Sequence, residues 1–569
     1  MRLNGSHILM QVLLEHEVDT IFGYPGGAVL HIYDALYDYK DKIKHIMPAD
    51  EQGAGYAADG YARASGKTGV VIATSGPGAT NLVTPLATAY MDSVPMVAIT
   101  GNVPRSLIGK DSFQEVYIAG ITMPITKHNF MVQKIEDLAP ILREAFKIAN
   151  SGRKAPVLVD IPKDVSAEFC EFEFCEPVKK SFILNDEARL SVKKALSLIK
   201  EAKKPLFYIG GGAKDSSKVL LKLINELKIP CVHTSMAAGT ISCYEPLNLG
   251  LLGMHGSKSA NLAVKHADLL IAVGARFSDR VALNTDKFGL NAKKIQIDID
   301  KSEHNKNVKV DCSIIADLNL ALKELEKQSE NLSLDTKAWQ DELENLRKEE
   351  AQNGDFGFYE NVPFTYDENT PFSAKNLFKL LSLRAGKDAI FTTDVGQHQM
   401  WALQYLAHQK PRSFLTSGGL GTMGFGYGAA LGAVLAMPTK RVFHISGDGS
   451  FIMNLNEVTT AVEYDLPVIS IILNNYTLGM VRQWQTSFYK RRYSSTDINK
   501  HFDYVKVAQG FNAEGFSVKS LSEFDKALKK ALSLKKPVWI ECIINKDAKV
   551  LPMIASGQSV DEIITKDEE

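Results

Sequence analysis

The stretch Val442-Phe-His-Ile-Ser-Gly-Asp-Gly449 joins an apolar run to a Gly-Asp-Gly turn, and 24 intervening residues separate it from Asn474-Asn475. These asparagines end a second apolar run, residues 468–473. If the two runs are neighbouring strands of a parallel sheet, their carboxyl ends deliver Asp448 and Asn475 to one point. Such hard oxygen ligands suit Mg²⁺, which completes its coordination with phosphate oxygens and water.

Gly449 and Ser450 follow the carboxylate, and their backbone N–H groups are placed to approach a phosphate at the next helix start. Asp-Gly and Asn-Asn are both common in loops, so two ordinary turns are the alternative. The turn, the spacing and the paired asparagines together favour a metal–diphosphate site.

Buried strands alternate with helix-period segments along most of the chain. Most of these strands are rich in Val and Ile and stop near Gly, Asp or Ser. The pattern predicts doubly wound α/β units that bind ligands at the carboxyl ends of their strands. The expected strands are residues 69–74, 94–100, 157–161, 205–209, 269–273, 295–299, 389–393, 442–446, 468–473 and 538–543.

The chain has 569 residues, which at about 150 residues per domain predicts three or four domains. Residues 164–186 suggest a linker, and the charge-rich stretch 323–370 suggests a second break that is helical to about residue 353. We therefore expect three doubly wound parallel-sheet domains, at residues 1–165, 186–345 and 370–555.

Composition excludes several classes of protein. Apolar residues make up 45% and charged residues 23%, which excludes a mainly disordered, collagen-like or coiled-coil chain. The net charge is −1 and no basic block interrupts the balance, so we expect no nucleic-acid partner. Six cysteines without a C-x-x-C pair, and an N-terminus without an apolar signal core, fit a cytoplasmic protein.

One uncharged stretch, residues 413–439, invites a membrane interpretation. It holds seven glycines among 27 positions, which suits close packing and backbone–ligand contact better than a lipid-facing helix. We expect no membrane segment.

Glu51 begins a segment of small residues that includes Gly53, Ala54, Gly55, Ala57, Ala58 and Gly60. A helix with such a face can lie close to a partner surface. Taken alone, a glutamate at a helix start is a favourable partner of the helix dipole and needs no further role.

The Gly-Asp-Gly and Asn-Asn pair resembles the pyrophosphate domain of the thiamine diphosphate (ThDP) enzymes. The resemblance implies Asp448, Asn475 and the carbonyl of Thr477 as Mg²⁺ ligands, with Gly421 and Met423 lining the aminopyrimidine. A competing dinucleotide fingerprint, residues 424–429, lacks a clear preceding strand and a later acidic residue, so that match is weak. Without the family, Met423 would be taken for a core methionine.

Residues 23–27, Glu51 and residues 74–81 resemble the pyrimidine-binding domain of the same enzymes in order and spacing. The resemblance implies Glu51 as the catalytic carboxyl that hydrogen-bonds the pyrimidine ring, shielded from water so that it can exchange a proton. The close family usually has His where this chain has Asp50, whose charge would push the pKa of Glu51 further up. In relatives this Glu serves the cofactor of another subunit, so a homodimer or homotetramer is implied.

Six segments resemble the acetolactate synthase (acetohydroxyacid synthase) family, catalytic subunits, and the resemblance extends from about Gly5 to Gly557. They are residues 111–115, 126–130, 159–164, 276–281, 395–401 and 478–484. The resemblance implies that Arg280 grips the carboxylate of the second 2-keto acid, for which a guanidinium fork is suited. It also implies diphosphate contacts from Gln397 and His398, and a substrate pocket lined by Phe113, Gln114, Lys163, Met480 and Trp484. Each residue alone has an ordinary alternative as a packed aromatic or a solvated charge.

The central part of the chain resembles the FAD-binding set of the biosynthetic acetolactate synthases. Glycines after a strand allow close approach to a pyrophosphate, and Asp298 lies near a strand end where a ribose could bind. The family usually has Asp at Ser278. The residues implied in FAD binding are Gly210, Gly211, Gly212, Met254, His255, Gly256, Arg276, Asp279, Asp298 and Ile299.

The leading hypothesis is ThDP-dependent decarboxylation of pyruvate and carboligation to a second 2-keto acid, pyruvate or 2-ketobutyrate, in branched-chain amino acid biosynthesis. The resemblance implies a flavin that does no net redox chemistry and a separate small regulatory subunit as a partner. Pyruvate oxidase is the main alternative. Glyoxylate carboligase is less favoured, because its relatives lack the glutamate present here as Glu51. A non-catalytic paralogue is a further alternative.

Overall fold

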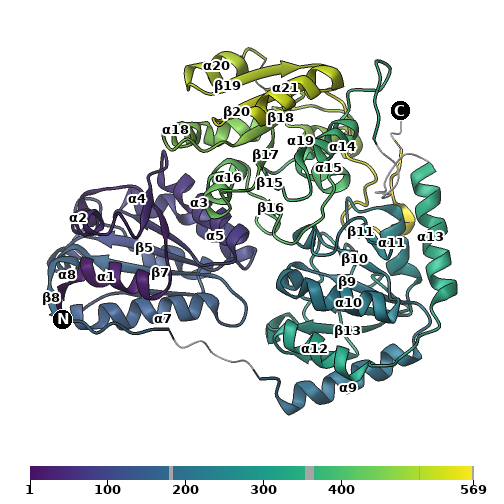
Figure 1. The fold of residues 1–569 in the computed structure, drawn as a ribbon, viewed down its shortest axis with the longest axis horizontal. Helices are drawn as coiled ribbons and strands as arrows, with labels where there is room; N and C mark the ends of the chain where they lie inside the picture. Colours follow the sequence, from purple (N-terminus) through teal and green to yellow (C-terminus); the bar gives the residue numbers. More distant parts are fainter. Residues whose placement is uncertain (178–182, 353–363, 499, 567–569) are drawn as a thin grey trace.

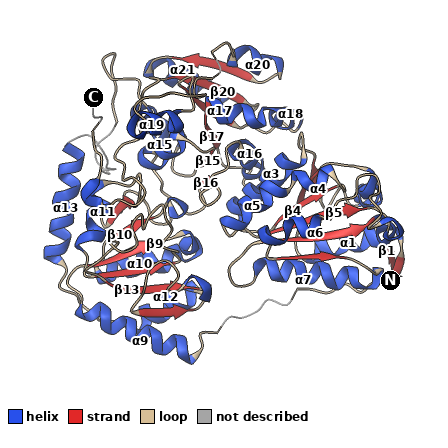
Figure 2. Ribbon diagram, turned by 180° about the vertical axis from the view of Figure 1, so that it is seen from behind, coloured by secondary structure: helices blue, strands red, loops and turns tan. Residues whose placement is uncertain are grey.

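The computed structural model describes residues 1–177, 183–352, 364–498 and 500–566. Three α/β units are arranged as a triangle, with the first at one corner, the central unit at another and the last between and above them (Figure 1). Each holds one six-stranded sheet in which all neighbouring strands are parallel. Helices enclose the three sheets (Figure 2). The predicted fold class is confirmed.

The first sheet has the strand order β3-β2-β4-β5-β7-β6. Its strands are β2 (Thr20–Gly23), β3 (Lys44–Ile46), β4 (Gly69–Ala73), β5 (Met96–Asn102), β6 (His128–Met131) and β7 (Pro156–Pro162). Its helices are α1 (Gly5–Glu15), α2 (Leu30–Asp38), α3 (Glu51–Ser65), α4 (Pro77–Asn81), α5 (Val83–Met91), α6 (Ile118–Thr122), α7 (Leu138–Asn150) and α8 (Lys163–Ala167).

The central sheet has the order β11-β10-β9-β12-β13-β14, which is 3-2-1-4-5-6 within the domain and is the order of dinucleotide-binding folds. Its strands are β9 (Pro205–Ile209), β10 (Cys231–His233), β11 (Asn248–Leu251), β12 (Leu269–Val273), β13 (Lys293–Asp298) and β14 (Cys312–Ile315). Its helices are α9 (Asp186–Glu201), α10 (Ser217–Leu227), α11 (Lys258–His266), α12 (Leu318–Gln328) and α13 (Lys337–Gln352).

The third sheet has the order β16-β15-β17-β18-β20-β19, which repeats the 2-1-3-4-6-5 arrangement of the first. Its strands are β15 (Ile390–Thr393), β16 (Phe414–Thr416), β17 (Val442–Gly447), β18 (Ile469–Asn474), β19 (Glu514–Val518) and β20 (Val538–Ile543). Its helices are α14 (Ala374–Ala385), α15 (Gln397–Tyr405), α16 (Phe425–Ala436), α17 (Asp448–Phe451), α18 (Val458–Glu463), α19 (Gly479–Phe488), α20 (Tyr504–Gly510) and α21 (Leu521–Ser533).

All ten predicted strands are present, and the largest shift is two residues, from 94–100 to Met96–Asn102. Each sheet falls inside one of the three predicted domain ranges. The expected linker at 164–186 begins with α8 and with β8 (Phe169–Glu171), which pairs antiparallel with β1 (Arg2–Asn4), and residues 178–182 of it lie outside the described residues. The second break contains the end of α12 and all of α13, and the rest of it lies partly outside the described residues.

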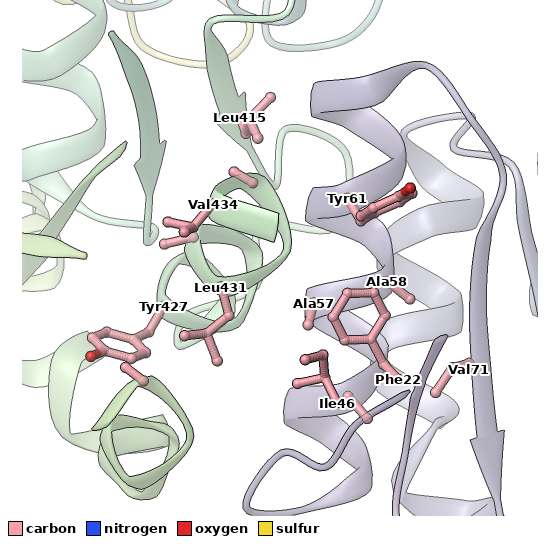
Figure 3. Packing of buried hydrophobic residues seen from close by; sticks show 14 of the residues in the cluster. Phe22, Ile46, Ala57, Ala58, Tyr61, Val71, Leu415, Tyr427, Leu431 and Val434 are labelled. Carbon is pink, nitrogen blue, oxygen red and sulfur yellow. The ribbon is translucent and has the colours of Figure 1, made fainter. Parts of the chain in front are cut away.

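Helices α3 and α16 pack closely together and join the first domain to the third (Figure 3). Their contact lies in a continuous apolar core that contains Phe22 and Ala58 from the first domain and Leu431 and Val434 from the third. A β-carbon at Gly60 would overlap the backbone of Ala429 in the opposite helix. The predicted small-residue face of α3 therefore does lie against a partner surface, which is another domain of the same chain.

The uncharged stretch 413–439 forms β16 and α16, and residues 425–434 of this helix are all buried. A helix that is apolar on all sides is a core helix here, because the sheet lies on one side and α3 on the other. Among the described residues, no helix has the length and apolar character needed to cross a membrane.

Replacing Gly432 with Ala tests the importance of this contact. A β-carbon at Gly432 would overlap the carbonyl oxygen of Ala57, and neither backbone can move away without separating the helices. We expect Gly432→Ala to cost about 1–3 kcal/mol of stability or more, measured as a lower thermal unfolding midpoint. Gly510→Ala is the control, because a β-carbon at that helical glycine meets nothing within 4 Å. Equal midpoints for both variants would contradict the packing argument.

Candidate cofactor site at the carboxyl edge of the third sheet

The predicted metal–diphosphate residues meet where the strand order of the third sheet reverses, between β15 and β17. Ligands of open α/β sheets bind in the crevice at such a point. Gln397 begins the helix that follows β15, Asp448 begins the helix that follows β17, and Asn475 follows β18. The hydroxyl of Ser450 donates to the carbonyl of Val395 (3.1 Å), which ties the first two turns together.

Asn475 and Gln397 are in direct contact. The Asn475 amide donates to Oε1 of Gln397 (3.2 Å), and its oxygen accepts from the backbone N–H of Thr477 (3.3 Å). Nε2 of Gln397 donates in turn to Gln483 (3.0 Å) and to the carbonyl of Ala548 (2.8 Å). The structure thus brings together four of the predicted residues, Gln397, Asp448, Asn475 and Thr477, from three separate turns.

Asp448 is 2% exposed. Burial raises the pKa of its carboxyl to about 7, although backbone N–H groups of Gly449, Tyr476 and Thr477 lower it. A nearby cation would restore the charged form. Among the described residues no cluster of three or more His, Cys, Asp or Glu side chains forms a metal site. One carboxylate, one amide and a main-chain carbonyl are instead the sparse oxygen set that suits Mg²⁺.

His398 lies beside this set. A β-carbon at Gly447 would lie 2.8 Å from its Nδ1, and one at Gly396 would lie 2.9 Å from its Cε1. Burial lowers the pKa of His398 to about 4, so the ring is neutral at pH 7. Its buried Nε2 has no hydrogen-bond partner among the described residues, which fits a ring that would contact a phosphate.

A buried network around Asp394 supports these turns, and sequence reasoning missed it. Oδ1 of Asp394 accepts from the backbone N–H of Gly426 (2.7 Å), and Oδ2 accepts from Ser446 (2.6 Å) and lies 3.0 Å from Nε2 of His444. Burial raises the pKa of Asp394, but His444 and Ser446 outweigh this and hold it below its ordinary value. The only signal in the sequence is that a predicted strand ends at an aspartate.

Residues 417–424 form the loop between β16 and α16, which we call the 417–424 loop. Gly421 has a φ of +72°, and a β-carbon added there would meet no atom within 4 Å. Met423 is half-buried. The glycines of the competing dinucleotide fingerprint, residues 424–429, lie in packing contacts. A β-carbon at Gly426 would lie 2.7 Å from the backbone of Asp394, and one at Gly428 would lie 2.7 Å from Tyr56 of α3. These glycines serve helix packing.

Glu51 lies at the carboxyl edge of the first sheet. Its carboxylate is buried and accepts from Nδ2 of Asn81 (2.9 Å), and a β-carbon at Gly78 would lie 2.8 Å from its Oε1. Gln114, at φ +60°, packs its backbone against Gly76 in the same turn. Two of the predicted residues of this domain, Glu51 and Gln114, therefore flank one glycine-rich turn.

The other predicted substrate residues are more dispersed. Phe113 is 88% exposed, and Lys163 is half-buried at the end of β7. On α19, Met480 packs against the core of the third domain, and the ring of Trp484 lies 4.9 Å from that of Phe488. Arg280 of the central domain is exposed beside Asp279, and its guanidinium lies 3.8 Å from the sulfur of Met254.

Asp50 caps helix α3, accepting from the backbone N–H of Gly53 (2.8 Å). Next to it lies Glu457, which ends the short 3₁₀ helix Ile452–Glu457 of the third domain and is fully buried. Its carboxylate accepts from the backbone N–H groups of Ala49 (3.3 Å) and Asp50 (3.3 Å) and from Thr460 (2.9 Å). Burial raises the pKa of Glu457 to about 7, and the Asp50 charge adds to this. Nothing in the sequence near Glu457 marked it.

The predicted FAD residues lie around the reversal of strand order in the central sheet, between β9 and β12. Gly210 and Gly212 pack against Gly274, and the N–H of Gly212 donates to the carbonyl of Gly274 (3.1 Å). Gly210 and Gly212 therefore allow close contact between the turns that follow β9 and β12. Asp298 ends β13, where burial raises its pKa. Gly211, Arg276 and Ile299 are half-buried near these turns, and Gly256 packs on the backbone of Leu251.

Met254 and His255 are buried between the central domain, the third domain and the C-terminal segment. The backbone of Met254 bonds to Arg280 (2.9 Å) and Ile554 (2.8 Å), and Gln404 donates to the carbonyl of His255 (3.0 Å). Burial, followed by the Arg280 charge, lowers the pKa of His255 to about 4. Its buried Nδ1 has no partner within the described part of the chain.

Three family models match this chain, one for each domain. Residues 3–121 match the thiamine pyrophosphate enzyme N-terminal TPP binding domain, residues 192–325 the central domain and residues 394–542 the C-terminal TPP binding domain. The three sheets and their sites therefore define a thiamine pyrophosphate enzyme.

The relatives narrow the family. The chain is 43% identical to the probable acetolactate synthase large subunit of Methanococcus aeolicus, over 99% of this chain and 95% of the relative. It is 42% identical to the acetolactate synthase isozyme 2 large subunit of Escherichia coli, over 99% of this chain and 100% of the relative. It is also 42% identical to the mitochondrial acetolactate synthase catalytic subunit of Saccharomyces cerevisiae, over 100% of this chain and 84% of the relative. The chain belongs to the acetolactate synthase family, among its large catalytic subunits.

The pKa of Glu457 predicts a pH dependence of stability. Its ordinary value is 4.5 and its folded value is about 7, so the folded state holds this proton more tightly than the unfolded chain. Protonated Glu457 therefore contributes to the free energy of unfolding. This contribution is fully present below pH 4.5 and is lost as the pH rises through 7. Glu457→Gln removes this titration. Its amide adds a cost that does not change with pH.

We therefore expect the stability of Glu457→Gln to rise relative to the parent between pH 5 and 8, by on the order of 2–3 kcal/mol, measured by unfolding midpoints. Glu463→Gln, at an exposed glutamate of the next helix, should show no such trend. A difference between Glu457→Gln and the parent that stays constant with pH would show that Glu457 is already ionised in the folded protein.

Proposed function

We propose that this chain is the catalytic subunit of a ThDP-dependent acetolactate synthase, which joins pyruvate, after loss of CO₂, to a second molecule of pyruvate or to 2-ketobutyrate. The observation that carries the proposal is the meeting of Gln397, Asp448 and Asn475 at the third-sheet edge, in a chain related over nearly its full length to acetolactate synthases. ThDP, when bound, supplies the electron sink for the decarboxylation and the carbon–carbon bond formation.

Mg²⁺ would be held by Asp448, Asn475 and the carbonyl of Thr477. The buried carboxylate with its raised pKa supports this, because the cation would supply the missing charge. Gln397, His398, Gly449 and Ser450 would hold the diphosphate beside the metal. Gly421 and Met423 would support the aminopyrimidine, since the glycine leaves its side of the loop open.

Glu51 would hold and exchange a proton at the pyrimidine nitrogen. Its burial and the hydrogen bond from Asn81 support this role, because such a carboxyl is shielded from water. Phe113, Gln114, Lys163, Met480 and Trp484 would line the substrate pocket, and Arg280 would bind the carboxylate of the acceptor. The exposure of the Arg280 side chain supports this, because a guanidinium fork suits bidentate contact with a carboxylate.

FAD would bind at the central sheet, with Gly210–Gly212, Met254–Gly256, Arg276, Asp279, Asp298 and Ile299 around it. The dinucleotide-type strand order supports this, and so does Nδ1 of His255, which is buried without a hydrogen-bond partner among the described residues. Its role would be structural. The alternative, a pyruvate oxidase that uses the flavin as an electron acceptor, is not favoured by relatives that are named acetolactate synthases.

A homodimer at least would complete the site, with Glu51 of one subunit serving the cofactor held by another. Several large apolar side chains support this, because they are exposed beside both half-sites of the single chain: Phe113, Tyr117, Met123, Leu420 and Met453. The large-subunit names of the relatives support a small regulatory subunit as a further partner, and six free cysteines are in keeping with a reducing cytoplasm.

Product analysis tests the proposed reaction. The purified protein with ThDP, Mg²⁺ and pyruvate should form acetolactate, and only when FAD is supplied or retained. Acetolactate formed by flavin-free protein would contradict the proposal that FAD binds at the central sheet. Acetate or acetyl phosphate as the product would overturn the carboligase and favour the oxidase.

Replacing Asp448 tests the metal site. Asp448→Ala removes the only carboxylate of the proposed set, so Mg²⁺-dependent binding of ThDP should be lost in titration calorimetry. Asp388→Ala is the control, because this aspartate is exposed at the opposite edge of the same sheet, paired with Lys410. Parental ThDP affinity in Asp448→Ala would overturn the metal assignment.

A further inference from the structure

The 417–424 loop belongs to the third domain, but side chains of the first domain hold it. At its apex, a β-carbon at Gly421 would meet nothing within 4 Å. At its base, a β-carbon at Gly419 would lie 2.8 Å from Met91 at the end of α5. The loop is therefore crowded where it meets the first domain and open where the cofactor ring would lie.

Asp92, directly after α5, is the main contact. Its Oδ2 accepts from the N–H of Gly418 (3.0 Å) and its Oδ1 from the N–H of Gly419 (2.7 Å). One carboxylate thus fixes two consecutive peptide planes. The Asp92 side chain is only 1% exposed, although the two glycines that it binds are exposed.

Arg63, near the end of α3, holds that carboxylate in place. Its Nη2 donates to Oδ2 of Asp92 (3.0 Å), and its Nη1 donates to the carbonyl of Thr416, where β16 ends and the loop begins (2.9 Å). Its side chain is 4% exposed and is also paired with Asp59. Hydrogen bonds between buried charged groups and backbone amides are among the stronger ones in proteins.

A second contact acts further along the loop. The hydroxyls of Thr88 in α5 and Thr422 are 2.8 Å apart, and the N–H of Thr422 donates to Ser417 (3.0 Å), which closes the base of the loop. Thr422 precedes Met423. The first domain therefore contacts both arms of the loop, one on each side of Gly421.

We propose that Asp92, oriented by Arg63, is a positioning residue that holds the 417–424 loop in the shape needed to present Gly421 and Met423 to the aminopyrimidine. The inference rests on the proposed function. Asp92 does not touch the reacting atoms. It acts through the loop, and it makes the cofactor geometry of the third domain depend on how the first domain of the same chain is docked.

The test uses Asp92→Asn in the full-length protein. The carboxamide keeps one acceptor but turns its NH₂ toward a backbone N–H or toward Arg63. Asp268→Asn is a matched control, because Asp268 also accepts from two consecutive N–H groups, those of Lys203 (2.7 Å) and Lys204 (2.9 Å), at the opposite edge of the central sheet. Thr88→Val removes the second contact with an isosteric side chain.

Two readouts are taken. Amide hydrogen exchange of peptides covering residues 417–424 is measured without cofactor, and exchange of the ThDP C2 proton is measured at saturating ThDP and Mg²⁺. We expect Asp92→Asn to raise the amide exchange and slow C2 exchange, each by about tenfold or more. Thr88→Val should shift both in the same direction by less, and Asp268→Asn should match the parent. Glu51→Gln should slow C2 exchange without changing the loop amides.

A folded Asp92→Asn that matches Asp268→Asn in both readouts would overturn the inference. If Asp92→Asn fails to fold, Thr88→Val serves as the test. Parental rates of loop amide exchange and of C2 exchange in Thr88→Val would then overturn the inference. Failure of the proposed function has a different signature, since the parent itself would then form no acetolactate from pyruvate. The loop amides would in that case still report whether Asp92 anchors the loop.

Discussion

The structure depends above all on the close approach of helices α3 and α16. Glycine at positions 60 and 432 lets the two backbones touch, and no other residue type fits there without separating them. Helix α3 begins at Glu51, and α16 follows the 417–424 loop. One steric contact therefore fixes the glutamate, the loop and the shared apolar core relative to one another.

Small-residue packing is not directional, and two helices in contact this way could slide or rotate. Buried polar groups at the two ends of α3 oppose this. At the start, Glu457 of the third domain accepts from the N–H groups of Ala49 and Asp50. Near the end, Arg63 binds Asp92 and the carbonyl of Thr416. Buried groups of this kind are costly when unpaired, so we interpret them as setting the register of the interface.

The sequence predicted the parts of the fold that repeat a local pattern. The ten strands predicted from apolar runs were found. Short edge strands such as Lys44–Ile46 have no apolar run and were not predicted. Asp448 and Asn475 were found because parallel strands end at one edge. Glu457, Asp92 and Asp394 were missed because their roles depend on long-range contacts that no local spacing encodes. The glycines of the dinucleotide-like stretch have the right spacing, but the tertiary packing uses them against α3 and the sheet.

The first and third sheets share one strand order, and each places a glycine-rich turn at the reversal of that order. Their polar residues are held by contacts within the same domain, such as Glu51 with Asn81 and Asn475 with Gln397. Each half-site is therefore supported by side-chain contacts within its own domain. The relation between the two halves depends instead on contacts between the domains. In a single chain that relation is controlled by the α3–α16 contact and by the 417–424 loop, which is built by one domain and held by the other.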